Sequence, residues 1–131
     1  MDTELQAEGL KRILVVEDDF SLRAMLSRFL ESLRYEVFTA EDGSIGLEKA
    51  TQLRPDLILT DLNLPFMSGL EMSAKIKSDP RLKDIPILMM TGDLTAMKDK
   101  LKGFGNGADD YIVKPVDIAV LAAKIKMILR G

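Results

Sequence analysis

Residues 56–65 read Asp-Leu-Ile-Leu-Thr-Asp-Leu-Asn-Leu-Pro, an apolar run that ends at the carboxylate of Asp61. Three successive aliphatic side chains at 57–59 are typical of a strand that is buried on both faces. Pro65 and Gly69 then turn the chain away from that strand. The stretch therefore predicts a central strand of a parallel sheet, with Asp61 at its carboxyl end.

Three further apolar segments are each followed directly by polar side chains. These segments are 13–16 before Glu17 and Asp18, 87–90 before Thr91, and 111–113 before Lys114. Parallel strands all end at the same edge of a sheet, where open α/β sheets bind their ligands. We therefore expect the acids, the hydroxyl and the ammonium to meet Asp61 at one edge.

The segments between the strands predict helices. Apolar residues recur with the spacing of one buried helical stripe at positions 22, 25, 26, 29, 30 and 33. Further elements are expected as a strand at 35–39 and as helices at 43–53, 70–77, 94–104 and 118–129. Gly46 inside the second helix costs about 1 kcal/mol relative to Ala. Five strands that alternate with five helices predict a doubly wound α/β fold with a parallel sheet.

The composition limits the possible functions. The chain has 131 residues, a length typical of one domain, and a formal net charge of -3 with a pI of about 5.0. This balance argues against nucleic acid or an anionic membrane as a direct partner, because both bind clustered Lys and Arg. The sequence contains no Cys and no His, so a bound metal must be held by oxygen atoms.

Residues 1–10 are expected to form a flexible tail, and residues 11–131 one domain. The first residues are polar and acidic, without the basic start and apolar centre of a signal peptide. No apolar run approaches the roughly 20 residues that span a bilayer. We therefore expect a cytoplasmic location.

Clustered carboxylates repel one another, by roughly 4 kcal/mol for two unit charges about 4 Å apart at an effective dielectric near 20. Such a cluster needs a cation, and Mg²⁺ prefers carboxylate and phosphate oxygens. Asp18 and Asp61 are the expected direct ligands, with the backbone carbonyl of Asn63 as a further one. Glu17 is expected to act through a water.

Asp61, at the centre of the cluster, can attack a phosphoryl group and form an aspartyl phosphate. Phosphoryl transfer spreads negative charge over the phosphoryl oxygens. The metal, Lys114 and Thr91 are therefore each expected to neutralise or hydrogen-bond one of these oxygens.

Five blocks of the sequence, in this order, resemble the receiver domain of two-component response regulators. They are Ile-Leu-Val-Val-Glu-Asp-Asp at 13–19, Asp-Leu-Ile-Leu-Thr-Asp at 56–61, Leu-Pro-Phe-Met-Ser-Gly-Leu-Glu at 64–71, Ile-Leu-Met-Met-Thr-Gly at 87–92, and Gly-Ala-Asp-Asp-Tyr-Ile-Val-Lys-Pro at 107–115. The likeness runs from about residue 11 to the end, and we expect no effector domain after it, as in single-domain chemotaxis regulators. It implies a flavodoxin-like fold with strand order 2-1-3-4-5.

The resemblance also implies a role for each residue of the site. Asp61 is the phosphoacceptor, Glu17 and Asp18 the acidic metal pair, Thr91 the switch hydroxyl, Lys114 the phosphate-binding lysine, and Tyr111 the switch aromatic. Asp19 lies outside the site, because the family pattern puts the metal pair in the first two places of the acidic run.

The partners that the resemblance implies are proteins. A sensor histidine kinase or a histidine phosphotransfer protein would donate the phosphoryl group. A downstream target would bind the face formed by 94–104, 111–113 and the last helix at 118–129. No nucleic acid and no membrane are expected to bind directly.

Three other classes of protein compete with the phosphorylation switch. An aspartate-nucleophile phosphatase would carry a second aspartate two positions after Asp61, where this chain has Asn63. Only slow self-catalysed phosphorylation and dephosphorylation are therefore expected. A flavin electron carrier would carry a Ser/Thr/Gly phosphate loop after the first strand, where this chain has three acids. The intact acceptor set argues against the third class, an interaction module that is never phosphorylated.

Overall fold

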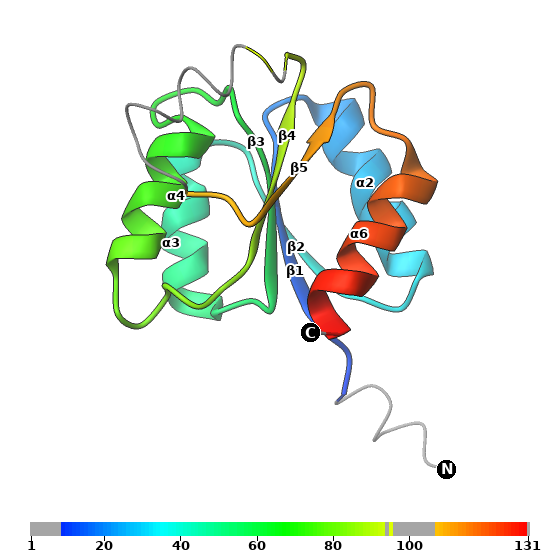
Figure 1. Cartoon of the computed structure of the whole chain (residues 1–131), viewed down its shortest axis with the longest axis horizontal. Coiled ribbons are helices and arrows are strands. Elements are labelled where there is room, and N and C mark those ends of the chain that lie inside the picture. Colours follow the sequence, from blue (N-terminus) through cyan, green and yellow to red (C-terminus); the bar gives the residue numbers. More distant parts are fainter. Residues whose placement is uncertain (1–8, 94, 96–106, 131) are drawn as a thin grey trace.

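Five parallel strands form one sheet in the order β2-β1-β3-β4-β5, the order that the resemblance to receiver domains implies (Figure 1). The computed structural model of the chain describes residues 9–93, 95 and 107–130. The strands are β1 (Arg12–Val16), β2 (Glu36–Ala40), β3 (Leu57–Asp61), β4 (Ile87–Thr91) and β5 (Asp110–Val113). The helices are α2 (Phe20–Ser32), α3 (Gly43–Leu53), α4 (Gly69–Ser78) and α6 (Ile118–Arg130).

The described part of the chain contains four helices, where the sequence predicted five for the whole chain. The remaining helix, expected at 94–104, lies outside the described residues apart from Thr95. The expected tail lies outside them as far as residue 8. Among the helices described, none has both the length and the apolar character that crossing a membrane requires.

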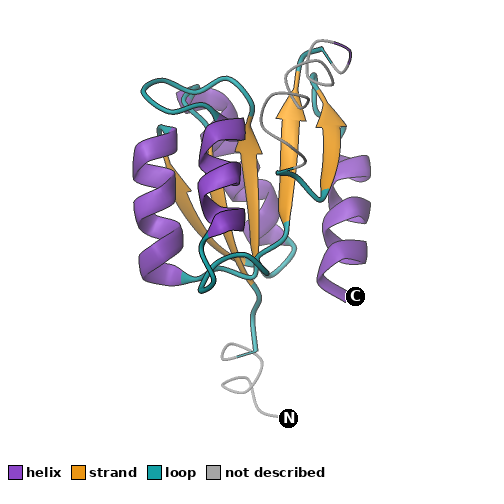
Figure 2. Ribbon diagram, turned by 60° about the vertical axis from the view of Figure 1, so that its left-hand side comes forward, coloured by secondary structure: helices purple, strands orange, loops and turns teal. Residues whose placement is uncertain are grey.

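The helices cover both faces of the sheet. Helices α3 and α4 lie on one side and α2 and α6 on the other (Figure 1), and all strand arrows in Figure 2 point toward the same edge. Each layer has its own core of buried side chains between helices and sheet. The carboxyl ends of all five strands therefore lie along one edge of the sheet, and open α/β sheets bind their ligands at such an edge.

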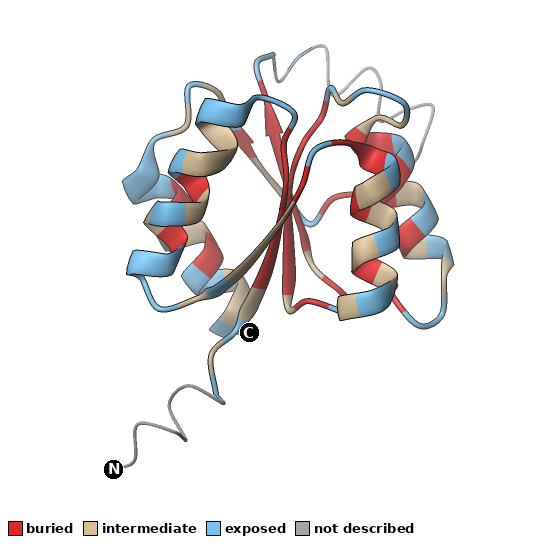
Figure 3. Ribbon diagram, turned by 180° about the vertical axis from the view of Figure 1, so that it is seen from behind, coloured by how far each residue is buried: buried red, intermediate tan, exposed pale blue. Residues whose placement is uncertain are grey.

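The side chains of β1 alternate between the two cores. Leu14 and Val16 belong to the core beneath α3 and α4, whereas Ile13 and Val15 belong to the core beneath α2 and α6. Because successive strand residues point to opposite faces, a strand covered on both sides must be apolar throughout. Figure 3 shows this burial along the sheet and on the inward faces of the helices.

The stripe predicted on α2 is confirmed at its centre and wrong at two positions. Leu26 and Leu30 are fully buried, whereas Met25 and Leu33 are each 40% exposed. Met25 lies about a quarter turn from Leu26 on a helix of 3.6 residues per turn, and so at the margin of the stripe. Leu33 is the C-cap, where the helix has already ended.

Gly46 allows α3 to pack closely against its neighbours. A Cβ at this position would lie 2.8 Å from Sδ of Met72 in α4 and 3.1 Å from the side chain of Val16 in β1. Real Cβ atoms essentially never come as close as the first of these distances. A larger residue at 46 would therefore require the buried side chains of Met72 and Val16 to shift, which offsets the propensity cost of the glycine.

Candidate functional site

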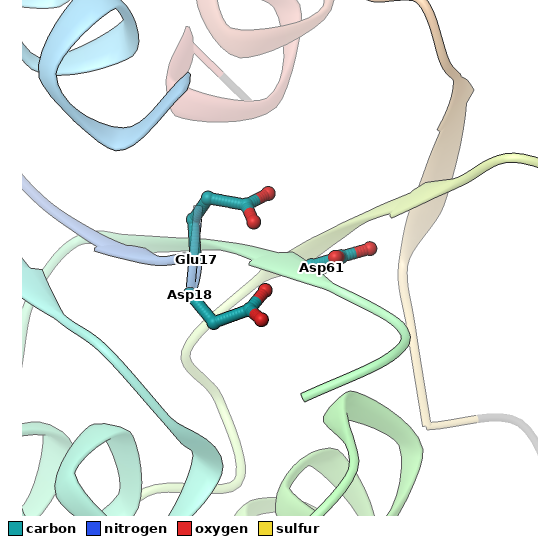
Figure 4. Close-up of side chains that lie close together, drawn as sticks. All are labelled: Glu17, Asp18 and Asp61. Atoms are coloured by element: carbon teal, nitrogen blue, oxygen red, sulfur yellow. The ribbon is translucent and has the colours of Figure 1, made fainter. Parts of the chain in front are cut away.

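Three carboxylates meet where β1 and β3 end. Glu17 and Asp18 follow β1 directly, and Asp61 is the last residue of β3. The two strands are hydrogen-bonded neighbours in parallel register. One oxygen from each carboxylate lies within 4.8 Å of the others, and Figure 4 shows the three side chains pointing toward a common space. The predicted convergence of these acids is confirmed, and the cluster can hold a metal ion.

The three acids differ in exposure. Glu17 is fully buried and Asp61 is 8% exposed, whereas Asp18 is an exposed residue. Burial raises the pKa of Glu17 above its ordinary value, and the negative charge of Asp61 adds to this effect. Hydrogen bonds from Asp19 N–H and the Lys114 ammonium oppose the rise. The cluster therefore opens to solvent on the side of Asp18.

Lys114 neutralises the buried part of the cluster. Its Nζ lies 3.0 Å from Oε1 of Glu17 and 3.0 Å from Oδ2 of Asp61. The backbone N–H of Lys114 donates to the carbonyl of Thr91 at 2.7 Å, which holds the residue at the end of β4. Burial alone would lower the pKa of Lys114, but the hydrogen bonds to Asp61 and Glu17 outweigh it and raise this pKa. One permanent cation thus serves two buried acids.

The hydroxyl of Thr91 is held by the backbone that follows it. Thr91 ends β4 and is nearly completely buried. Its Oγ1 donates to the carbonyl of Asp93 at 3.2 Å and accepts from the N–H of Asp93 at 3.1 Å. Met90, one residue earlier, pairs with Asp61 in the sheet. The hydroxyl therefore lies on the predicted edge while it is bonded to the loop after its own strand.

Asn63 and Tyr111 are the two remaining residues that the sequence predicts for the site. Asn63 is exposed in the loop after β3. Tyr111 lies in β5 and packs against the core beneath α3 and α4. Burial raises the pKa of Tyr111, and the neighbouring charges of Asp109 and Asp110 add to this rise. The metal role of Asn63 and the switch role of Tyr111 stay predictions.

The loop after Asp61 folds back onto the strand end. The N–H of Gly69 donates to the carbonyl of Leu62 at 2.8 Å, and the N–H of Leu62 donates to the carbonyl of Met90 at 2.9 Å. A Cβ on Gly69 would lie 2.1 Å from the carbonyl oxygen of Asp61. Any other residue at 69 would therefore displace the backbone that carries Asp61. The sequence indicated a turn at Gly69 but not this close approach.

A family model for the response regulator receiver domain matches residues 13–126. The chain belongs to the response regulator receiver family. Members of this family are signalling domains of two-component systems rather than classical enzymes, and they interact with kinases and downstream targets. The resemblance stated from the five sequence blocks is confirmed.

Curated relatives of this receiver include two regulators from bacteria. The chain is 41% identical over 121 residues to the DNA-binding dual master transcriptional regulator RpaA of Synechocystis, covering 92% of this chain and 50% of the relative. It is 43% identical over 121 residues to the response regulator ArlR of Staphylococcus aureus, covering 92% and 53%. The receiver therefore spans about half the length of these relatives.

Solved structures similar to this receiver include the chemotaxis response regulator CheY4 of Vibrio cholerae. That structure has a TM-score of 0.82 and 34% identity, and the match covers 91% of this chain and 98% of the other. The receiver domain of a sensor histidine kinase from Pseudomonas aeruginosa has a TM-score of 0.86 and 27% identity, covering 94% and 100%. A magnesium ion is coordinated in the active-site cleft of that Pseudomonas domain.

The sequence reasoning missed two contacts that shape the acidic end of the receiver. Asp19 is the N-cap of α2, with Oδ2 accepting from the N–H of Leu22 at 2.8 Å, so its side chain is used outside the cluster as expected. Its own N–H donates to Oε2 of Glu17 at 3.0 Å. Arg23, one turn into α2, donates to the carbonyls of Glu17 and Asp18. The only signal in the sequence was a basic residue one turn after the acidic run.

Proposed function

We propose that this receiver accepts a phosphoryl group on Asp61 from the phosphohistidine of a sensor histidine kinase or a histidine phosphotransfer protein. The reaction depends on Mg²⁺, and the phosphorylated domain signals to a downstream protein. The observation that carries the proposal is the placement of Asp61 within 3.0 Å of the Lys114 ammonium and among carboxylates that can hold a cation. A nucleophile, a fixed cation and carboxylates that can hold a metal ion thus meet at one edge of the sheet.

The donor set suits Mg²⁺. Asp18 and Asp61 would hold the ion, with the backbone carbonyl of Asn63, and the ion would neutralise charge on the transferred phosphoryl group. Glu17 has one carboxylate oxygen bonded to Lys114 and the other to the N–H of Asp19. Glu17 is therefore better placed to act through a water than to bind directly. The magnesium ion in the active-site cleft of the Pseudomonas receiver supports Mg²⁺ as the ion at this site.

The transfer itself is a single displacement. A carboxylate oxygen of Asp61 attacks phosphorus, the new O–P bond forms, and the P–N bond to the donor imidazole breaks with its electron pair leaving on nitrogen. Lys114 keeps its proton and stabilises the charge on a phosphoryl oxygen. Self-catalysed phosphorylation from small donors and slow dephosphorylation use the same groups. No acid follows at position 63 to speed the hydrolysis.

The switch would begin at Thr91. A phosphate on Asp61 adds a charge of about -1.5 to -2, which attracts a hydroxyl donor. The Thr91 hydroxyl would leave the backbone of Asp93 for a phosphoryl oxygen, and Tyr111 would then turn inward. This movement changes the face that includes residues 94–104, β5 and α6, where we place the downstream protein. Driving such a switch from about 1% to about 99% active takes about 5.5 kcal/mol.

Residues 11–131 would act as one receiver unit in the cytoplasm, with protein partners and without direct nucleic-acid contact. A net charge of -3 supports this last point.

Intact-mass spectrometry after incubation with acetyl phosphate tests the proposal. We expect the mass of one phosphoryl group to be added only when Mg²⁺ is present. The adduct should be labile to hydroxylamine, as an acyl phosphate is, and absent from Asp61→Asn. A folded protein that binds Mg²⁺ but gains no mass would instead favour an interaction module that is never phosphorylated.

A further inference from the structure

Arg23 connects helix α2 to the acidic turn that precedes it. Its Nη1 donates to the carbonyl oxygen of Glu17 at 2.8 Å and to that of Asp18 at 3.3 Å. The guanidinium therefore bonds the backbone of the two residues whose carboxylates form one side of the cluster. Hydrogen bonds from a charged donor are stronger than neutral ones, so this contact restrains the turn.

The guanidinium of Arg23 is itself held in place. It lies 5.6 Å from the ring centroid of Phe20, within the range of a cation–π contact. Phe20 is the first residue of α2 and its side chain is 72% exposed. The turn is also tied from within, because the N–H of Asp19 donates to Oε2 of Glu17. Arg23 thus lies between an aromatic ring and the carbonyls of the turn.

Asp18 depends on this restraint more than the other two acids do. Lys114 holds the carboxylates of Glu17 and Asp61 directly. Within the described residues, no protein hydrogen bond to the carboxylate of Asp18 is found, and the residue is exposed. The direction of the Asp18 side chain is therefore set by its backbone, which Arg23 bonds at the carbonyl.

We propose that Arg23 is a positioning residue for the metal site. It holds the backbone of 17–18 so that the carboxylate of Asp18 faces Asp61 before Mg²⁺ arrives, which lowers the cost of ordering the ligands. The inference rests on the proposed function for its biological meaning, but it concerns metal affinity and can be measured without phosphorylation. In other proteins, groups that orient metal ligands without binding the metal themselves change metal affinity by about 10- to 100-fold.

The direction in which Arg23→Met changes the Kd for Mg²⁺ separates a positioning role from a purely electrostatic one. Arg23 is a cation close to a cluster that binds a cation. If it acted only through its charge, Arg23→Met would strengthen Mg²⁺ binding, because a repulsive charge is removed. If it positions Asp18, the same substitution weakens binding despite the more favourable field. The two explanations predict opposite changes in Kd.

Isothermal titration calorimetry with Mg²⁺ alone gives the test. We expect Arg23→Met to raise the Kd about tenfold, and Arg23→Lys to recover part of the loss because a lysine also donates to carbonyls. Arg28→Met is the matched control: it removes the same charge from an exposed position on the same helix and should stay within about twofold of the unmodified protein. An unchanged or lower Kd for Arg23→Met, in a protein that retains its circular dichroism and cooperative melting, would overturn the inference.

Labelling by acetyl phosphate separates this inference from the proposed function. At saturating Mg²⁺ we expect Arg23→Met to be labelled within about twofold of the normal rate, whereas at limiting Mg²⁺ it should be slower by the change in Kd. A tenfold deficit that persists at saturation would show that Arg23 acts on the transfer step, and so contradict positioning. If the unmodified protein is not labelled at all, the proposed function fails while the Mg²⁺ titration still decides the role of Arg23.

Discussion

The two ends of the sheet use the same pair of residue types in different ways. At the amino end of β5, Lys77 pairs with Asp109 and Lys124 pairs with Asp110, one cation for each acid. Both of these acids are more than 40% exposed. At the carboxyl ends of β1 and β3, the single ammonium of Lys114 bonds both Glu17 and Asp61, whose side chains are only 1% and 11% exposed.

The difference lies in the charge that is left over. The two pairs at the amino end are neutral and exposed, and such pairs contribute about 0–1 kcal/mol to stability. The carboxyl end has Asp18 in addition to the two acids that Lys114 serves, so the cluster retains excess negative charge in a largely buried place. A balanced pair stabilises the fold by itself, whereas an unbalanced cluster needs a further cation. This contrast marks the carboxyl end as the one that can hold a metal ion.

Removing Lys114, the lysine that Glu17 and Asp61 share, should have the largest effect on the carboxyl end. In Lys114→Met the phosphoryl oxygens lose their fixed cation, and we expect labelling by acetyl phosphate to slow by about 10²- to 10³-fold, the effect of losing one such contact in other enzymes. The rate is measured by intact mass over time at saturating Mg²⁺. Lys124→Met is the control, and it should change the rate by less than about twofold. If Lys114→Met and Lys124→Met slowed labelling equally, the total charge of the protein, and not the position of Lys114, would determine the rate.

Removing Asp18 should bring the carboxyl end closer to charge balance, with Glu17 and Asp61 left on the single cation of Lys114. We expect Asp18→Ala to abolish stabilisation by Mg²⁺, which for the unmodified protein reaches about 2.7 kcal/mol at an ion concentration of 100 times Kd. Without metal the variant should be slightly more stable, because one repulsive charge is gone. Thermal melting with and without Mg²⁺ measures both effects. A lower melting temperature without metal would refute the idea that the acids repel one another.

The two ends should also differ in their response to pH, because the pKa of Glu17 is raised and that of Asp110 is lowered. Burial raises the pKa of Glu17, so its charge is lost at a higher pH than for an ordinary glutamate. We expect Mg²⁺ affinity to fall by about tenfold as the pH drops through this raised pKa, since the ion loses one attracting charge. Titration calorimetry at a series of pH values from 7.5 downward follows the change. The Glu17→Gln variant should bind Mg²⁺ weakly and should lack this part of the pH dependence of Mg²⁺ affinity.

At the amino end, the paired acid Asp110 gives the contrasting case. Burial would raise the pKa of Asp110, but the hydrogen bonds from Lys124 and from the N–H of Tyr111 outweigh it and lower this pKa. A lowered pKa in the folded state adds stability above the ordinary aspartate pKa, and this stability is lost as the pH falls through the lowered value. We therefore expect the contribution of Asp110, isolated as the difference from Asp110→Asn, to be constant between pH 7.5 and 5.

The smallest expected effect concerns backbone strain beside Asp61. Arg34 and Arg54, at the opposite edge of the sheet, have positive φ angles of 72° and 46° just after helices, where such conformations are common. Phe66 has a φ of 67° in the loop at the carboxyl edge, and its side chain is 90% exposed. We expect Phe66→Gly to stabilise the protein by about 0.5–1 kcal/mol, the strain relieved less the chain entropy that glycine adds. Urea unfolding measures this, and a destabilised variant would show that Phe66 contributes packing instead.

Much of the fold was accessible from local sequence patterns. Several elements begin within about one residue of the predicted position. They are the strands that start at residues 12, 57 and 87 and the helices that start at residues 43 and 118. A strand buried on both faces must be continuously apolar, so β3 was visible from three adjacent aliphatic residues. The margins of α2 were predicted less well. Whether Met25 is covered depends on the neighbouring elements rather than on the helix itself.

The order of the elements and the residue types at the strand ends follow from the sequence alone. Because parallel strands share one edge, the sequence also predicted that Glu17, Asp18, Asp61 and Lys114 would meet. Which of their atoms touch depends on the tertiary structure. Lys114 lies 97 residues from Glu17 in the chain, and its ammonium reaches both acids only through the register of four strands and the loop after β5.

The same holds for the contacts that no periodicity encodes. Three such contacts depend on loop paths that packing sets. They are the hydrogen bonds from Arg23 to the acidic turn, the hydrogen bonds between the Thr91 hydroxyl and the Asp93 backbone, and the close approach of Gly69 to the Asp61 carbonyl. A pattern of apolar residues specifies faces, since burial is averaged over a whole element. Hydrogen bonds and ion pairs require atoms to be placed within a few tenths of an ångström, and only the assembled core fixes their positions so closely.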